Sequence, residues 1–147
     1  MKKIFIFLNL LIVGLCFSYA QKKVEKIELN GDTYTVTKAF PKEILGKYLY
    51  EKKGDPIVEL FENGEGVFQP HITAPIKIKF WIDCDEKGNP RKEQHIESRY
   101  GYTLLIQYLD GTNGNYPVGK YDLMGVHILK DIGYAVIYSE RYKPLTD

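Results

Sequence analysis

Apolar and polar residues alternate in short runs along most of this 147-residue chain. In the clearest run, residues 76–84, every second residue is apolar, and Lys77, Lys79 and Trp81 fall on the opposite face. A period of two is typical of a β-strand that buries one face. By the same pattern, further strands are expected at residues 24–29, 33–38, 46–51, 56–61, 66–69, 102–108, 117–130 and 134–138.

Turn-forming residues, such as the pair Asn63 and Gly64, separate these runs. They tolerate positive φ and suit tight hairpins. One short helical turn is expected near residues 41–45, where Pro41 fits a first helical position. Eight or nine strands joined by hairpins, without βαβ spacing, predict an all-β antiparallel meander. We expect this meander to close as a barrel, which removes exposed strand edges, with a β-sandwich as the alternative.

The first twenty residues have the pattern of a cleavable secretory signal. Lys2 and Lys3 precede an apolar run at residues 4–17, and Ser18 and Ala20 provide the small residues of a cleavage site. Cleavage after Ala20 would leave a single β domain at residues 21–147. This domain is expected to be periplasmic or secreted. The alternative is a lipid anchor on Cys16. The apolar run is too short for a helix that spans a bilayer, which needs about 20 residues.

Removal of that segment changes the composition in two ways. The loss of Lys2 and Lys3 from 20 basic residues, against 19 acidic ones, leaves a formal charge of −1. Such a balance offers no electrostatic footprint for nucleic acid, so no nucleic-acid partner is expected. Cys84 becomes the remaining cysteine, which excludes an intramolecular disulfide and leaves stability to the core.

Residues 39–48 and 57–68 resemble the entrance and the following strands of small bacterial lipocalin-like proteins. That family begins with a short helical turn and a Gly-x-Trp motif, which Gly46 and Tyr48 match with Tyr in place of Trp. The resemblance implies a closed barrel from about Phe40 to Tyr142. It also implies that Arg141 closes the barrel by stacking over Tyr48, a cation–π contact of about 0.5–2 kcal/mol.

The sequence gives little indication of a metal-binding site. Residues 83–89 resemble a calcium loop, but Lys87 stands where the loop needs an oxygen ligand, so an acidic hairpin tip is favoured. His71, His95 and His127 lack the short spacing of structural zinc ligands. No metal and no cofactor are therefore expected.

A catalytic site is not evident either. Asp83 and Asp85 flank Cys84 and would raise the pKa of its thiol, which suits a buried structural residue rather than a nucleophile. The acidic residues are scattered, and no pair can be singled out for acid–base chemistry. Enzymatic activity therefore ranks third among the functions considered.

The abundant aromatic residues are the best indication of function. A barrel of about eight strands is either filled by its side chains or holds one small ligand. Alternation predicts these inward, ligand-binding candidates: Phe68, Phe80, Tyr102, Tyr108, Tyr134 and Tyr138. If the last two point inward, alternation directs Arg141 outward unless a bulge intervenes. The leading hypothesis is an exported, non-catalytic protein that binds a small apolar or amphipathic ligand.

The alternative is an envelope protein-interaction module with a filled core and no small-molecule ligand. Its partner surface would surround Trp81, on the outer face of its strand, and the loop at residues 110–115. A cavity of several hundred Å³ would favour the first hypothesis, and a solid interior the second.

Overall fold

The computed structural model describes residues 22–145, apart from residues 53, 55, 112 and 113. The expected signal segment at residues 1–20 and the alternative lipid site at Cys16 lie outside the described residues. The described chain forms one antiparallel sheet and a single 3-10 turn, η1 (Lys42–Ile44), so the all-β prediction is confirmed. Its strands are β1 (Val24–Leu29), β2 (Asp32–Thr37), β3 (Gly46–Tyr50), β4 (Ile57–Leu60), β5 (Glu65–Gln69), β6 (Ile76–Asp83), β7 (Glu93–Ile96), β8 (Arg99–Tyr108), β9 (Tyr121–Leu129), β10 (Tyr134–Ile137) and β11 (Glu140–Leu145).

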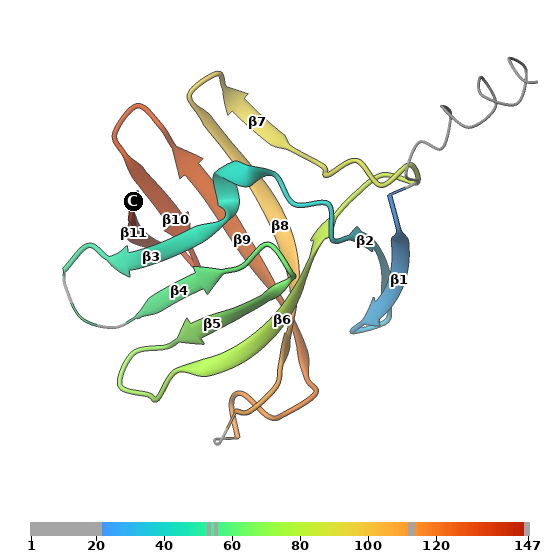
Figure 1. The fold of residues 1–147 in the computed structure, drawn as a ribbon, viewed down its shortest axis with the longest axis horizontal. Coiled ribbons are helices and arrows are strands. Elements are labelled where there is room, and N and C mark those ends of the chain that lie inside the picture. The colour runs from blue at the N-terminus through green and yellow to red at the C-terminus, as the bar shows by residue number, and fades with distance from the viewer. Residues whose placement is uncertain (1–21, 53, 55, 112–113, 146–147) are drawn as a thin grey trace, which may run out of the picture.

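Eight of these strands close into a barrel (Figure 1), which confirms the predicted architecture. β3, β4, β5 and β6 pair in succession, β8 to β11 do the same, and the pairings β6–β8 and β11–β3 close the ring. β7 and β11 were not predicted as strands. All four residues of β7 are exposed, and β11 contains Pro144, so neither carries a clear alternating pattern.

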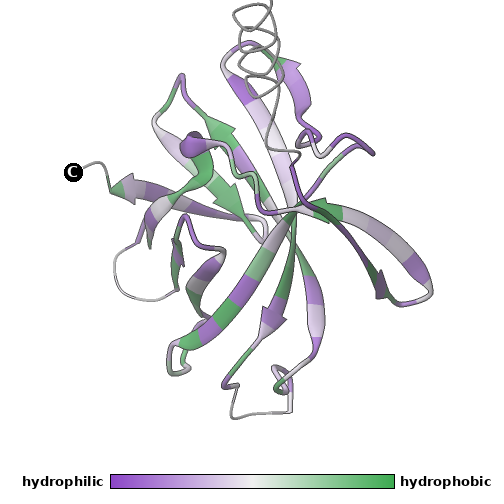
Figure 2. Ribbon diagram, turned by 45° about the vertical axis from the view of Figure 1, so that its right-hand side comes forward, coloured by the Kyte–Doolittle hydropathy of each residue, from purple (hydrophilic) through white to green (hydrophobic). Residues whose placement is uncertain are grey.

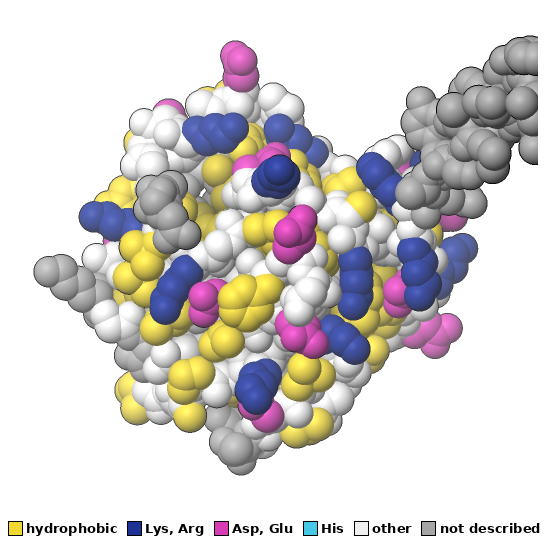
Figure 3. Space-filling model, in the orientation of Figure 1, with side chains coloured by type: hydrophobic (Ala, Val, Ile, Leu, Met, Phe, Trp, Pro, Cys, Tyr) yellow, Lys and Arg dark blue, Asp and Glu magenta, His cyan; other side chains and the backbone are white. Residues whose placement is uncertain are grey.

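Three strands, β1, β2 and β7, lie outside the barrel and attach to the ends of β6 and β8. The end of β6 pairs with β2, and the start of β8 pairs with β7. The β1–β2 hairpin and β7 therefore project from the barrel, at the right and the top of Figure 1. Basic and acidic side chains are interspersed over the face seen in Figure 3.

The main core fills the inside of the barrel with alternate residues of its strands. Along β8, the even-numbered positions from Tyr100 to Tyr108 all point inward and are buried. Figure 2 shows the corresponding bands of opposite hydropathy along the barrel strands. Because each strand contributes one face, the inner layer is apolar although the sequence never forms a long apolar run.

A second, smaller core lies outside the barrel, under the β1–β2 hairpin. Trp81 and Leu105 point outward from β6 and β8 and pack with Val36 of the hairpin. Trp81 keeps only 6% of its surface exposed, and Lys38 Nζ lies 5.5 Å from the centroid of its ring. The expectation that Trp81 presents a ring to solvent is therefore wrong. Alternation does place it on the outer face, but the hairpin covers that face.

The 3-10 turn at residues 42–44 confirms the helical turn predicted near residues 41–45, and it closes one end of the barrel. Ile44 is fully buried there, and the Tyr48 hydroxyl donates a hydrogen bond of 2.8 Å to its carbonyl oxygen. Gly46 follows with a φ of +125°, a backbone conformation that residues other than glycine rarely adopt. Gly46 and Tyr48 therefore fix how the chain enters the first barrel strand.

Candidate functional site

The two ends of the barrel differ in how they are closed. At the end near η1, Phe40 covers Phe80 with ring centroids 4.5 Å apart. The Tyr102 hydroxyl donates a 3.0 Å hydrogen bond to a carboxylate oxygen of Glu43 in η1. This end, called the closed end below, is packed and capped.

At the opposite end the barrel is hollowed by a cavity of about 470 Å³. The connections β3–β4, β5–β6, β8–β9 and β10–β11 all leave the barrel at this end, called the open end below. Aromatic side chains form much of the cavity wall, namely Phe68, Tyr108, Tyr116, Tyr138 and Tyr142. Their rings touch one another: the Phe68 centroid lies 5.3 Å from that of Tyr138 and 5.9 Å from that of Tyr116.

Two carboxylates also face this cavity. Asp122 is in phase with the inward residue Met124 of β9, and Glu140 is in phase with Tyr142 of β11. Both are half-buried. A polar residue at an inward position breaks the apolar pattern of a barrel core, and such breaks mark functional sites more often than structural ones.

Each carboxylate already has defined partners. The Tyr108 hydroxyl donates a 3.0 Å hydrogen bond to Asp122 Oδ2, and the Leu123 backbone N–H donates one of 2.8 Å to Oδ1. Glu140 Oε1 lies 2.7 Å from His71 Nε2. The carboxylates are thus held in fixed positions at the cavity wall.

The tyrosines around them are neutral hydrogen-bonding groups. Burial raises the pKa of Tyr108, Tyr138 and Tyr142 above the usual range. The charge of Asp122 adds to the shift at Tyr108, and that of Glu140 to the shift at Tyr142. Interaction with the Tyr108 hydroxyl adds to the raised pKa of Tyr138. At neutral pH these phenols are therefore protonated, and that of Tyr108 donates to the Asp122 carboxylate.

The structure brings three of the six aromatic candidates to the cavity, namely Phe68, Tyr108 and Tyr138. Phe80 and Tyr102 also point inward, as predicted, but they belong to the packed core near the closed end. They fill the barrel there and do not border the open cavity.

Tyr134 lies on the outside of the barrel, so its predicted inward orientation is wrong. In β10 the aliphatic residues Ala135 and Ile137 point inward instead. Tyr138 has the same parity as Tyr134 but belongs to the turn after the strand. Both turn residues, Tyr138 and Ser139, have positive φ values, 49° and 65°. This primed turn lets the Tyr138 side chain line the cavity despite the phase of the strand.

Arg141 does not stack over Tyr48, which corrects a second expectation. Its guanidinium carbon lies 5.6 Å from the ring centroid of Tyr134 on the outer face. Its Nε lies 3.8 Å from a carboxylate oxygen of Glu51. β11 faces inward through Tyr142, so Arg141 points outward, and no bulge reverses it.

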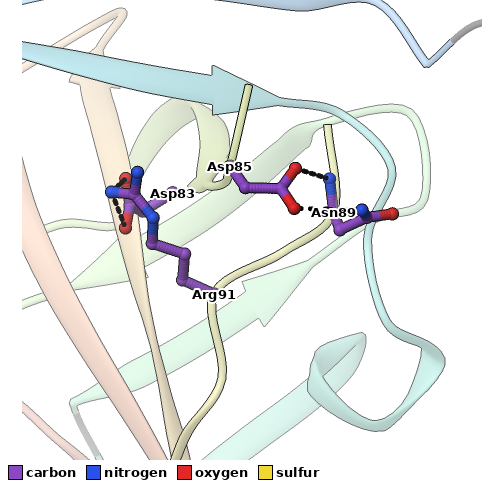
Figure 4. A network of polar contacts seen from close by, with 4 residues as sticks. All are labelled: Asp83, Asp85, Asn89 and Arg91. Carbon is purple, nitrogen blue, oxygen red and sulfur yellow. Dashed lines mark hydrogen bonds and ion pairs between the residues drawn. The ribbon is translucent and has the colours of Figure 1, made fainter. Parts of the chain in front are cut away.

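The acidic segment after β6 is a hydrogen-bonded hairpin tip (Figure 4). One Asp85 oxygen accepts the backbone N–H groups of Lys87 and Asn89, and the other accepts the Asn89 side chain. The Asn89 hydrogen bonds, with that of Lys87, lower the pKa of Asp85. Asp83 pairs with Arg91 at 3.3 Å. The carboxylates thus serve the turn itself, and the described residues contain no cluster of three metal-ligating side chains.

Cys84 is buried beside this turn, and burial, followed by the charges of Asp83 and Asp85, raises the pKa of its thiol. A thiol with a raised pKa is a poor nucleophile, which agrees with a structural role.

Neither Asp122 nor Glu140 was predicted as a site residue from the sequence. A signal was available for Asp122, because it falls two residues before Met124 and in phase with Val126 and Ile128 of the same predicted strand. The inward position of Glu140 was harder to predict, because β11 was not expected as a separate strand. His71 was considered only as a metal ligand, and its pairing with Glu140 joins two distant segments.

No family model, curated protein or solved structure matches this chain. Within the described part of the chain, no helix has the length and apolar character needed to cross a membrane.

Proposed function

We propose that this protein is an exported, non-catalytic barrel that binds one small amphipathic molecule in its open end. The observation that carries the proposal is the cavity of about 470 Å³, with aromatic walls and two inward carboxylates. Ligand sites are commonly concave, several hundred Å³ in volume, mainly apolar, and provided with a few oriented polar groups.

The proposal extends to the type of barrel. A short helical turn leads into the first barrel strand, Gly46 and Tyr48 open that strand, and the last strand pairs back onto it. This arrangement supports a lipocalin-like barrel, with one capped end and one end open to a ligand. Export itself rests on the sequence of residues 1–20.

The interaction-module alternative has less support. It required an exposed surface around Trp81, and that side chain lies under the β1–β2 hairpin. It also required a filled core. The barrel core does extend to Phe68, Tyr108 and Tyr142, but at the open end a cavity of about 470 Å³ lies against these residues.

Two measurements test the ligand-binding proposal. Native mass spectrometry of protein purified from its own host should detect a bound small molecule. A neutral fluorescent probe, N-phenyl-1-naphthylamine, should bind and brighten in the purified protein, because an apolar dye gains from aromatic walls.

A matched pair of variants locates the binding site. Tyr138→Ala removes a cavity wall and should weaken probe binding severalfold. Tyr134→Ala removes the same side chain from the outer face, four residues away, and should leave probe binding unchanged. Equal effects of the two variants, or no bound molecule and no probe binding, would contradict the proposal.

A further inference from the structure

The charges that face the open cavity are of one sign. Asp122 and Glu140 are both part of its wall, and the described lining residues include no Lys or Arg. Among the described residues, His71 is the basic side chain that contacts one of these carboxylates, that of Glu140. The cavity therefore has a negative field unless a ligand balances it.

The Asp122 carboxylate keeps capacity for a further donor. Each of its oxygens accepts one hydrogen bond, from Tyr108 and from the Leu123 backbone. A carboxylate has about four acceptor positions, more than these two hydrogen bonds fill. Hydrogen bonds from an ammonium group to a carboxylate are among the stronger ones, so a cationic donor is favoured at this position.

The aromatic walls favour the same kind of ligand. The rings of Phe68, Tyr116 and Tyr108 follow one another, with the centroids of Tyr108 and Tyr116 5.3 Å apart, and Tyr138 packs against Phe68. The face of an aromatic ring is electron-rich and attracts a cation. Because the tyrosines remain protonated, their rings add no formal charge, and the carboxylates determine the sign of the field.

From this arrangement we infer that the cavity selects an amphipathic organic cation. Such a ligand is a protonated amine or quaternary ammonium group on an apolar body. The cationic group would lie between Asp122 and Glu140 with the aromatic rings around it, and the apolar body would occupy the rest of the cavity. The same carboxylates would repel an anionic amphiphile of equal size. This inference rests on the proposed ligand-binding function.

Calorimetric titration with three probes that share one tail separates the two proposals. Decylammonium, decanol and decanoate, each below its micellar concentration or solubility limit, present a cationic N–H donor, a neutral and an anionic head group. We expect the cation to bind at least about tenfold more tightly than the anion, the ratio expected from one charge-assisted contact. Decanol should bind with intermediate affinity.

Two charge-removing variants locate the selectivity. Asp122→Asn and Glu140→Gln should each reduce the affinity for the cation by about tenfold, while decanol binding changes little. Glu62→Gln, a change of the same charge at the exposed β4–β5 turn of the closed end, serves as the control and should change neither affinity. Either cavity variant suffices if the other fails to fold.

The outcomes have distinct meanings. If decanol binds as tightly as the cation, or both cavity variants keep the full preference, the inference is overturned while ligand binding stands. If no decyl compound binds, both proposals fail.

Discussion

The two ends of this barrel come from the same alternating strands, yet they differ in what those strands present inside. At the closed end, Phe80 and its neighbours are fully buried and η1 covers them. At the open end, the inward positions include Asp122 and Glu140 beside a cavity. The closed end is therefore explained by the packing of the core. At the open end, charged side chains interrupt the apolar pattern of the inner face, as is typical of functional sites.

The largest expected effect is a difference in stability loss when a core ring is removed from each end. Phe80→Ala should lower the free energy of unfolding by about 3–5 kcal/mol, because it leaves a void in a closed core. Phe68→Ala should cost less than about 3 kcal/mol, because its ring already borders a cavity. Urea unfolding followed by the fluorescence of the single tryptophan, Trp81, measures both. Equal losses would show that the open end is packed as tightly as the closed end.

A smaller effect compares two phenols. Tyr48→Phe leaves the buried carbonyl of Ile44 without its 2.8 Å partner and should cost about 1–3 kcal/mol. Tyr108→Phe should cost less than about 1 kcal/mol, because water in the cavity can replace the lost partner of Asp122. The same urea titrations measure this difference, and a larger cost for Tyr108→Phe would contradict it.

The smallest effect is one that both ends should share. Burial raises the pKa of Tyr48, near the closed end, and of Tyr142, near the open end, above the ordinary tyrosine value of about 10. The folded state therefore retains protons that the unfolded state loses, so stability is complete below pH 10 and declines as the pH rises further.

Each phenol contributes up to about 1.4 kcal/mol per pH unit to this decline. Stability measured at pH 8, 10 and 11 should therefore fall less steeply in Tyr48→Phe and in Tyr142→Phe than in the unaltered protein. Identical slopes in all three proteins would mean that these phenols are not buried in the folded state.

Much of the fold was determined by local pattern. The period of two along residues 76–84 and the turn residues between runs predicted antiparallel strands, and the segment at residues 41–45 predicted the helical turn. β7 and β11 escaped prediction for physical reasons. β7 is exposed throughout, and Pro144 interrupts β11, so neither strand needs an alternating sequence.

The site was predictable only in part, because alternation gives the relative phase of residues and not the face that is inside. Phe68 and Tyr108 were placed correctly, but Tyr134 was assigned to the wrong face since Ala135 and Ile137 fill the interior in its place. Tyr138 lines the cavity for a reason unrelated to strand phase, namely the positive φ values of its turn.

By itself, the sequence determined the strand class, the antiparallel connections and the aromatic character of the chain, because these follow from interactions between near neighbours, whereas closure of the barrel depends on the distant pairings β6–β8 and β11–β3. Tertiary structure alone decided that a hairpin covers Trp81, that Arg141 lies over Tyr134, and that the cavity forms at one end. It also brought Asp122 and Glu140, from two strands that are not adjacent, to the same cavity. Contacts between distant segments depend on register and closure, which no single segment encodes.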